Sequence, residues 1–447
     1  VQDKLMNEDI TPCLYLNEFT DEEFESFREL DHERYQSASS DSGERFERKE
    51  YDVEVGAVDL FSQSSLNGFV KSPKDYLFGK VTDSADQDYF RKGNLYHDFA
   101  EFYANHSEFV EEKGLEVFIE LMIDEMSSIV DELELDTLKT KFRVGSKNII
   151  EFVDREVQEE VELEGYSQLD NKENFFSEHF DKDIENSFTE AWFENPELGA
   201  KGIADLIIDK NNLADYKSGN KKTAQSIVGS SILNLVEDEP NFQAMLYLAQ
   251  LRTVRPDEKL GFTFFHFIDN IDEEMSGEPS IDDNIVTINY YPNDFSEFVA
   301  SKEMFNYIMQ SSRSEGKVAK GNDRRKTLEV RSGFEHYKEF FEGRDLQNVF
   351  DADQLQDEIL EEMIEHFKAI IGDHGYVEDG CEAALKRIVG FRKKNYFKKD
   401  IDEFEEFLEK QLDLLNEYRR EGFPVQNPEL DTQVEIVDLD HKEMISQ

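Results

Sequence analysis

Residues 202–219 read GIADLIIDKNNLADYKSG, and this stretch limits the choice of fold more than any other part of the chain. Two apolar runs flank DKNN, a tetrad of turn-forming residues, so the stretch predicts two antiparallel strands. Side chains alternate between the faces of a strand, so Asp215 and Lys217 face one way and Tyr216 the other. With a loop of three or four residues, Asp205 comes opposite Asp215 or its neighbour. The hairpin therefore predicts two carboxylates and an ammonium group at one end of a sheet.

The strand pattern continues on both sides of this hairpin. Five segments are short, rich in β-branched and aromatic residues, and separated by turn residues: SFTEAWF, GIADLII, LADYK, LGFTFFHFI and NIVTINYY. Helical periodicity marks residues 64–80, 88–105, 114–133, 239–254 and about 400–420. The sequence thus predicts an α+β fold (α/β in the broad sense), in which helices flank a mixed five-strand sheet.

The same patterns divide the chain into three parts. Residues 1–60 are expected to form an N-terminal extension or linker. Residues 61–300 form the core, with a helical insertion at about 107–185, and residues 301–447 form a mainly helical region that packs back on the core. The insertion and the C-terminal region are the large helical additions to the predicted core.

The chain is very acidic, with 102 Asp and Glu against 49 Lys and Arg and a net charge of −53. The acidic residues are dispersed, as on proteins of a high-salt cytoplasm, where the Debye length falls to about 3 Å at 1 M salt. The alternative is an acidic protein that never meets nucleic acid, and composition alone favours it. No apolar run of about 18 residues predicts a membrane helix, and two cysteines exclude a disulfide scaffold. We therefore expect a cytoplasmic protein with no membrane partner.

The residue types in the hairpin suit metal chemistry. Carboxylates and carbonyls are the ligands that Mg²⁺ and Mn²⁺ prefer. A lysine beside them can position or deprotonate a water, or neutralise charge on a phosphate oxygen. The alternative is a surface salt bridge, which is the commoner meaning of D-x-K alone. With Asp205 upstream, the two interpretations become about equal.

The hairpin resembles the active-site hairpin of the PD-(D/E)XK nucleases, whose core is restriction-endonuclease-like. The branch it resembles most is the RecB type, with the nuclease domains of RecB and AddB and the CRISPR-associated adaptation nucleases. Two further motifs of that branch are present. Gln243 and Tyr247 match Q-x-x-x-Y on the helix after the D-x-K strand, and at i and i+4 they share a helix face. Gly93 and His97 match the upstream G-x-x-x-H, whose imidazole binds metal.

The resemblance implies roles for particular residues. The implied metal ligands, for Mg²⁺ or Mn²⁺, are His97, Asp205, Asp215 and the carbonyl of Tyr216. The implied catalytic residues are Asp205, Asp215, Lys217, Gln243 and Tyr247. Glu190, on the preceding strand, is a weaker candidate for a second metal or for water positioning.

One departure from the family concerns an iron–sulfur cluster. FSQSSLNGFVKSPKDYLF, residues 61–78, resembles the segment that carries the first cluster cysteine, and Ser72 stands at that position. The turn Glu421–Pro424 resembles the one that precedes the other three cysteines, and no cysteine follows it. Because such clusters need thiolate ligands, we expect none here. The resemblance covers about residues 60–295 and the 420s and leaves 107–185 and 300–400 unexplained.

Basic residues are few and local. The candidates for DNA contact are Lys221, Lys222, Lys320, Arg324, Arg325 and Lys326, each with the alternative of a solvated face. For the run Arg392–Lys399 we favour the solvated face. No G-x-x-x-x-G-K-[ST] motif occurs, so we expect no nucleotide cofactor. TPCLYLNEF, residues 11–19, resembles the segment that leads into the nuclease domain of helicase–nucleases, which implies a helicase subunit or domain as a partner.

Taken together, the motifs predict a metal-dependent DNA nuclease. Its implied role is DNA end processing in recombination and repair, with CRISPR adaptation and host defence as other settings. One alternative is a catalytically inactive nuclease-fold subunit that guides DNA or scaffolds a complex. Another is an acidic interaction protein, for which His97, Asp205 and Asp215 should lie far apart.

Overall fold

The structure is a computed structural model. It describes residues 4–5, 8–9, 60–73, 76–77, 88–130, 132–157, 161, 163–168, 173–184, 188–231, 240–268, 281–309, 333–349, 353–373 and 376–421. The chain divides into two compact units. One consists of Val55–Lys71 and Ser84–Leu414, and the other of Val1–Glu54, Ser72–Asp83 and Leu415–Gln447. In the latter, β1 (Lys4–Leu5) pairs antiparallel with β2 (Glu8–Asp9).

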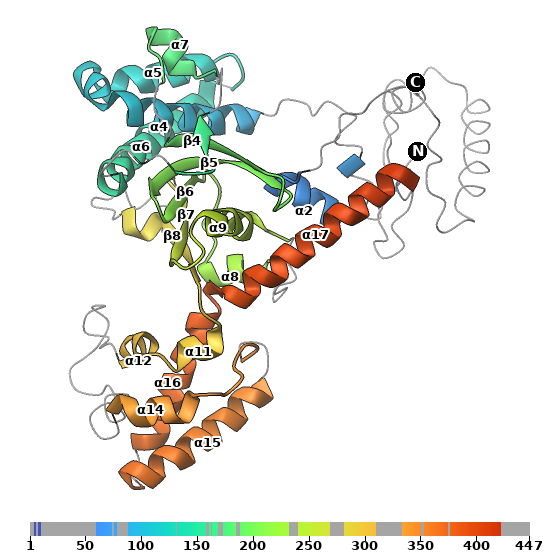
Figure 1. Cartoon of the computed structure of the whole chain (residues 1–447). Helices are drawn as coiled ribbons and strands as arrows, with labels where there is room; N and C mark the ends of the chain where they lie inside the picture. Colours follow the sequence, from blue (N-terminus) through green and yellow to red (C-terminus); the bar gives the residue numbers. More distant parts are fainter. Residues whose placement is uncertain are drawn as a thin grey trace. The chain divides into compact units, whose positions relative to one another are not determined.

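The centre of the unit that contains Ser84–Leu414 is a mixed sheet of seven strands in the order β3-β4-β5-β6-β7-β8-β9, of which Figure 1 labels β4 to β8. Its strands are β3 (Ser167–Gln168), β4 (Thr189–Asn195), β5 (Ala200–Asp209), β6 (Asn212–Tyr216), β7 (Leu260–Phe265), β8 (Ile285–Tyr291) and β9 (Asn395–Phe397). Neighbours are antiparallel except the parallel pairs β6–β7 and β8–β9. The predicted mixed α+β architecture is confirmed. The predicted count of five strands is wrong, because β3 and β9 extend the sheet at its two edges.

Helices lie on both faces of the sheet. Before β4 come α2 (Gln63–Lys71), α4 (Asp88–Lys113), α5 (Leu115–Met126), α6 (Glu132–Glu156) and α7 (Phe175–Phe180). Between β6 and β7 come α8 (Ala224–Gly229) and α9 (Gln243–Val254). Phe265 of β7 stacks on Phe152 of α6 at 4.1 Å between ring centroids, whereas Phe262 contacts Tyr247 of α9 at 5.0 Å. The two opposite faces of β7 are therefore covered by different helices, which explains why every residue of this strand is buried.

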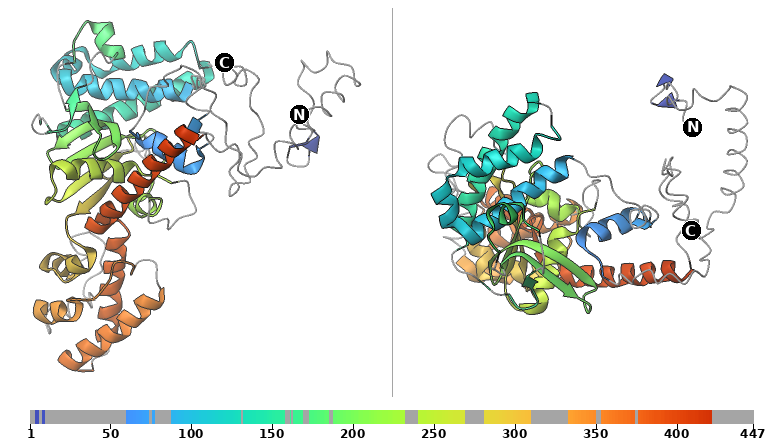
Figure 2. Two further views of the ribbon diagram at one scale, coloured as in Figure 1. Left: turned by 45° about the vertical axis from the view of Figure 1, so that its right-hand side comes forward. Right: turned by 90° about the horizontal axis from the view of Figure 1, so that it is seen from above.

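The helices α4 to α7 pack together as one group, which can be followed in Figure 1 and in both views of Figure 2. Their shared core is aromatic: Phe102 of α4 lies within 6.0 Å of the ring centroids of Phe118 and Phe176. Helix α4 is kinked at His106, whose backbone is non-helical, with φ −136° and ψ 40°. The kink falls at the end of the helix predicted for 88–105, and the chain resumes a helical course beyond it.

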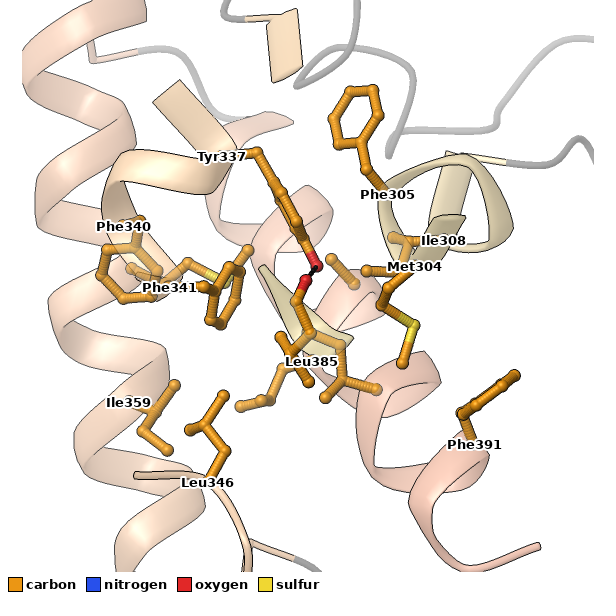
Figure 3. Close-up of a cluster of buried hydrophobic side chains, with 14 of the residues drawn as sticks. Met304, Phe305, Ile308, Tyr337, Phe340, Phe341, Leu346, Ile359, Leu385 and Phe391 are labelled. Atoms are coloured by element: carbon orange, nitrogen blue, oxygen red, sulfur yellow. Dashed lines mark hydrogen bonds between the residues drawn. The ribbon is translucent and has the colours of Figure 1, made fainter. Parts of the chain in front are cut away.

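Between β8 and β9, the described residues of 292–394 form a helical addition. It contains α11 (Phe295–Val299), α12 (Lys302–Met309), α14 (Gly333–Phe341), α15 (Asp353–Ile371) and α16 (Tyr376–Arg392). These helices enclose a hydrophobic cluster that also includes Tyr291 of β8 and Phe397 of β9. Within it the Tyr337 hydroxyl donates to the Val299 carbonyl at 2.8 Å (Figure 3). The chain then returns to the sheet as β9 and continues into α17 (Lys398–Glu421).

The segment that leads from α16 through β9 into α17 contains a buried ion pair, and one prediction is wrong there. Arg392 was expected on a solvated face, but its side chain is 0% exposed. Its guanidinium lies 2.6 Å from Asp400, which also accepts from the Gln347 side chain at 3.1 Å and from the Phe397 N–H at 2.7 Å. The charge is tolerated in the interior because its partner is fully hydrogen-bonded.

Candidate active site

The predicted antiparallel hairpin forms, and its register brings two aspartates together. The expected loop of three or four residues is wrong: Asp209 pairs with Asn212, so the turn has two residues, and the register shifts between Ile207 and Asp209. In the β5–β6 ladder Leu206 pairs with Ala214 and Ile207 with Leu213. One further step of that register places Asp205 opposite Asp215. The side chain of Asp205 also accepts a hydrogen bond from the Tyr216 N–H at 2.6 Å. The carboxylate of β5 is thereby fixed to the main chain of β6.

Asp215 is held by two side chains. Lys217 Nζ lies 2.6 Å from its Oδ2, and Gln243 Nε2 donates to its Oδ1 at 2.5 Å. Gln243 is the first residue of α9 and is itself buried. Burial alone would lower the pKa of Lys217, but the Asp215 carboxylate outweighs it, so this pKa is raised. Lys217 is therefore a permanent cation at neutral pH.

A second group of ligand atoms comes from three elements. His97 of α4 has its Nδ1 3.5 Å from Asp205 Oδ2 and 3.7 Å from Glu190 Oε1. One potential ligand atom from each of these residues lies within 4.8 Å of the others. Glu190 belongs to β4, where Thr189 pairs with Leu206 and Ala191 with Ala204, so it stands opposite Asp205. Glu190, Asp205 and Asp215 thus share one row across three strands.

The backbone at Glu190 is strained. Its φ is 47°, in the left-handed region that residues other than glycine rarely occupy. Such a conformation persists where surrounding structure imposes it, and it is found most often at functional sites. Here it occurs in β4 at the residue whose carboxylate faces His97, so the strained backbone carries one of the potential ligands.

The acidic row perturbs the pKa values of its members. Burial and the nearby Asp215 charge raise the pKa of Asp205 to about 7, against the opposing pull of His97. Burial lowers the pKa of His97, but Asp205, Glu190 and Asp215 outweigh it and raise this pKa to about 9. The site therefore has more negative charge than its own imidazole and lysine neutralise, which favours a bound cation.

Tyr247 supports β5 immediately before Asp205. Its hydroxyl donates to the carbonyl of Ile203 at 2.5 Å. Gly202 makes room for this contact, because a Cβ there would lie 3.0 Å from the Tyr247 hydroxyl and 2.8 Å from the Phe193 ring. Burial, followed by the charges of the two aspartates, raises the pKa of Tyr247, so the phenol stays neutral. The two residues of Q-x-x-x-Y thus hold different parts of the same hairpin.

The Tyr216 side chain points to the opposite face, as predicted. Its ring meets the His97 ring edge-on at 5.8 Å and also contacts Phe152 and Phe265. The Tyr216 side chain therefore packs the end of β6 against His97, and its N–H holds the Asp205 carboxylate. Its carbonyl stays a predicted ligand.

The structure places the predicted DNA contacts only in part. Lys221 and Lys222 are exposed in the segment after β6, and the Lys221 ammonium donates to the Asp283 carbonyl. Lys320, Arg324, Arg325 and Lys326 lie outside the described residues, as do Gly422–Pro424 and residues 11–19. Ser72 is buried in the other unit, and Cys381 is buried in the helical addition.

Comparison of the chain with family models, with curated proteins and with solved structures found no match. The interpretation of the site therefore rests on its geometry. Of the described helices, none is long and apolar enough to cross a membrane.

Two residues near the site were not singled out in the sequence. Asn174 precedes α7 and is 2% exposed, and Glu101 is 6% exposed one helical turn after His97. Asn174 could have been found as an N-cap before the helical stretch FFSEHF. Its contact with α4 could not, because it joins residues more than seventy positions apart.

Proposed function

We propose that the chain is a metal-dependent nuclease that hydrolyses phosphodiester bonds in DNA. The observation that carries the proposal is the convergence of His97, Glu190 and Asp205 beside the Asp215–Lys217 pair. An acidic interaction protein gives no reason for these residues to meet. Nor does it give a reason for a strained Glu190 or for a glutamine that fixes Asp215.

The donor set fits a divalent cation. It offers one imidazole nitrogen and carboxylate oxygens from β4 and β5, with Asp215 in the same row. Such oxygen-rich sets suit Mg²⁺ and Mn²⁺. When bound, a divalent ion lowers the pKa of a coordinated water and stabilises negative charge on a phosphate.

The protein's own groups divide the remaining work. Lys217 is 35% exposed at its side chain and is oriented by Asp215, so its ammonium can reach a phosphate oxygen or a water. Its raised pKa makes it a hydrogen-bond donor and a fixed positive charge, and a poor general base. Gln243 keeps Asp215 in position, and Tyr247 keeps the β5 backbone in position before Asp205.

The setting of the activity is part of the same proposal. Lys217, Lys221 and Lys222 give the segment after β6 a local positive charge suited to one phosphate backbone. We propose end processing for recombination and repair in the cytoplasm, with a helicase as partner. We place the DNA contact on these three lysines alone, because the acidic surfaces of the described helices would repel phosphate.

The test compares two aspartates of the same strand. Asp205→Asn removes a charge from the row of carboxylates. Asp209→Asn makes the same change at the turn, where Asp209 Oδ1 accepts a hydrogen bond from the Asn211 N–H at 2.7 Å. The amide oxygen of an asparagine can accept that bond in place of the carboxylate. With Mg²⁺ or Mn²⁺ and labelled DNA, in low and molar salt, Asp205→Asn should abolish cleavage and Asp209→Asn should preserve it. Full cleavage by Asp205→Asn would refute the proposal. Binding of metal and DNA without cleavage by the unaltered chain would favour the guiding subunit instead.

A further inference from the structure

Helix α7 is attached to α4 at the turn that follows His97. The side-chain amide of Asn174 donates to the Asp98 carbonyl and to Glu101 Oε2, each at 2.9 Å. The Phe175 N–H approaches Asp98 Oδ2 at 3.3 Å. Asn174 and Glu101 are both buried, so water does not replace these bonds easily. One amide therefore fixes the helical turn beside the imidazole.

The same amide also starts α7. Its oxygen accepts from the N–H groups of Phe176 and Ser177 at 3.0 and 3.1 Å, as an N-cap does. The acceptor half of Asn174 thus serves α7 and the donor half serves α4. Only an amide of this length offers both halves at once, since serine and aspartate cap a helix without an N–H₂ donor.

A second attachment lies at the other end of α7. His106 Nε2 is 2.9 Å from the Asp183 carbonyl, at the kink of α4. Between the two attachments, the Phe176 ring packs on Phe99 and Phe118 with centroids 5.9 and 5.6 Å apart. Helix α7 is therefore bound along α4 from Asp98 to His106, the turns that follow the metal ligand.

We propose that Asn174 is a positioning residue for the metal centre, because its amide fixes the turn of α4 that carries His97. The inference rests on the proposed function. The imidazole is 3.5 Å from Asp205 and 3.7 Å from Glu190, and the three residues come from separate elements. Rotation of α4 about its axis changes both distances together. Asn174 resists that rotation through two bonds on the face next to His97.

The experiment separates the amide from the packing of α7. Asn174→Ser keeps a capping oxygen but is too short to reach Asp98 and Glu101. Phe176→Leu loosens the aromatic contact and leaves the amide bonds in place. For the full chain and both variants, Mn²⁺ affinity is measured by calorimetry and the melting temperature by circular dichroism. Asn174→Ser should weaken Mn²⁺ binding by about tenfold or more, while Phe176→Leu stays within about twofold at an equal or larger loss of melting temperature.

Three outcomes would overturn the inference. If Asn174→Ser binds Mn²⁺ as tightly as the unaltered chain, the amide does not position His97, and the metal site itself stands. If Phe176→Leu weakens binding as much as Asn174→Ser, the effect belongs to general loosening of α7. If the unaltered chain binds no Mn²⁺, the metal centre fails and the role of Asn174 fails with it.

Discussion

The Asp205 carboxylate accepts a hydrogen bond from the Tyr216 N–H at 2.6 Å, across two strands and eleven positions of sequence. This bond orients one oxygen of Asp205 toward the end of β6, where Asp215 and Lys217 stand on either side of Tyr216. The geometry of the acidic row is thus set by main chain as well as by side chains. Changes that leave the hairpin intact but alter its charges should therefore act on chemistry more than on folding.

Loss of the Lys217 ammonium should reduce cleavage by about 10²–10³-fold, the usual effect of removing one group that stabilises developing charge. The informative variant is Lys217→Met, which keeps the length of the side chain. Because Lys217 acts as a fixed charge, Lys217→Arg should retain part of the activity. Cleavage rates under single-turnover conditions measure both. Lys410→Met, at an exposed lysine of α17 that is no proposed DNA contact, is the control and should change the rate little.

Without metal, the free energy of unfolding should fall as the pH rises. The pKa of Asp205 is about 7 in the folded chain against an ordinary 3.8, so its ionisation penalises the fold increasingly between those values. The pKa of His97 is about 9 against 6.5, so the stability that its protonated form contributes below 6.5 is lost as the pH rises through about 9. Urea unfolding from pH 4 to pH 9 measures the combined decline.

Divalent metal should reverse that trend. Metal competes with protons for the same groups, so Mn²⁺ affinity should rise over the same pH range. Asp205→Asn should flatten the part of the metal-free profile below pH 7. A metal-free protein that gains stability between pH 5 and pH 9 would contradict the charge arrangement described here.

Gly202→Ala should reduce activity and stability together. Its Cβ would displace the Tyr247 hydroxyl or the Phe193 ring, and such overpacking costs about 1–3 kcal/mol. Gly93, the glycine of the G-x-x-x-H motif, provides a contrast, because a Cβ there meets nothing within 4 Å. Gly93→Ala lies inside α4 and should stabilise the protein by up to about 1 kcal/mol. Thermal unfolding and cleavage assays on both variants check the comparison.

Replacement of Arg392 by methionine should destabilise the protein by about 3–5 kcal/mol, because Asp400 would be left charged in the interior. The double variant Arg392→Met, Asp400→Leu should recover part of the loss, since neither charge then remains. Urea unfolding of the single and double variants distinguishes a buried pair from a surface one. Equal stabilities of the unaltered chain and Arg392→Met would mean that the pair is solvated in solution.

Local sequence predicted the hairpin and the helix with Gln243 and Tyr247, because strand alternation, turn residues and helical periodicity are local signals. It left the register of the hairpin open by one residue, because the turn and the register shift between Ile207 and Asp209 are not visible in the alternation. It also selected His97, through a resemblance and not through periodicity. Strands β3 and β9 could not be predicted, since two or three residues show no alternation. The burial of Arg392 and the amide contacts of Asn174 depend on partners distant in sequence, which composition and periodicity do not reveal.

Strand β9 closes the outer edge of β8, yet residues 292–394 intervene between the two strands. During synthesis, β8 is complete long before its parallel neighbour exists. An uncovered strand edge is a template for pairing with other chains, and parallel pairing across a long intervening segment forms slowly. The helices around Tyr337 can pack before β9 docks and so shorten the distance that β9 must search, and Phe397 of β9 then completes their core. The rate at which the helical addition folds would then determine how long the edge of β8 stays exposed to aggregation in a newly made chain.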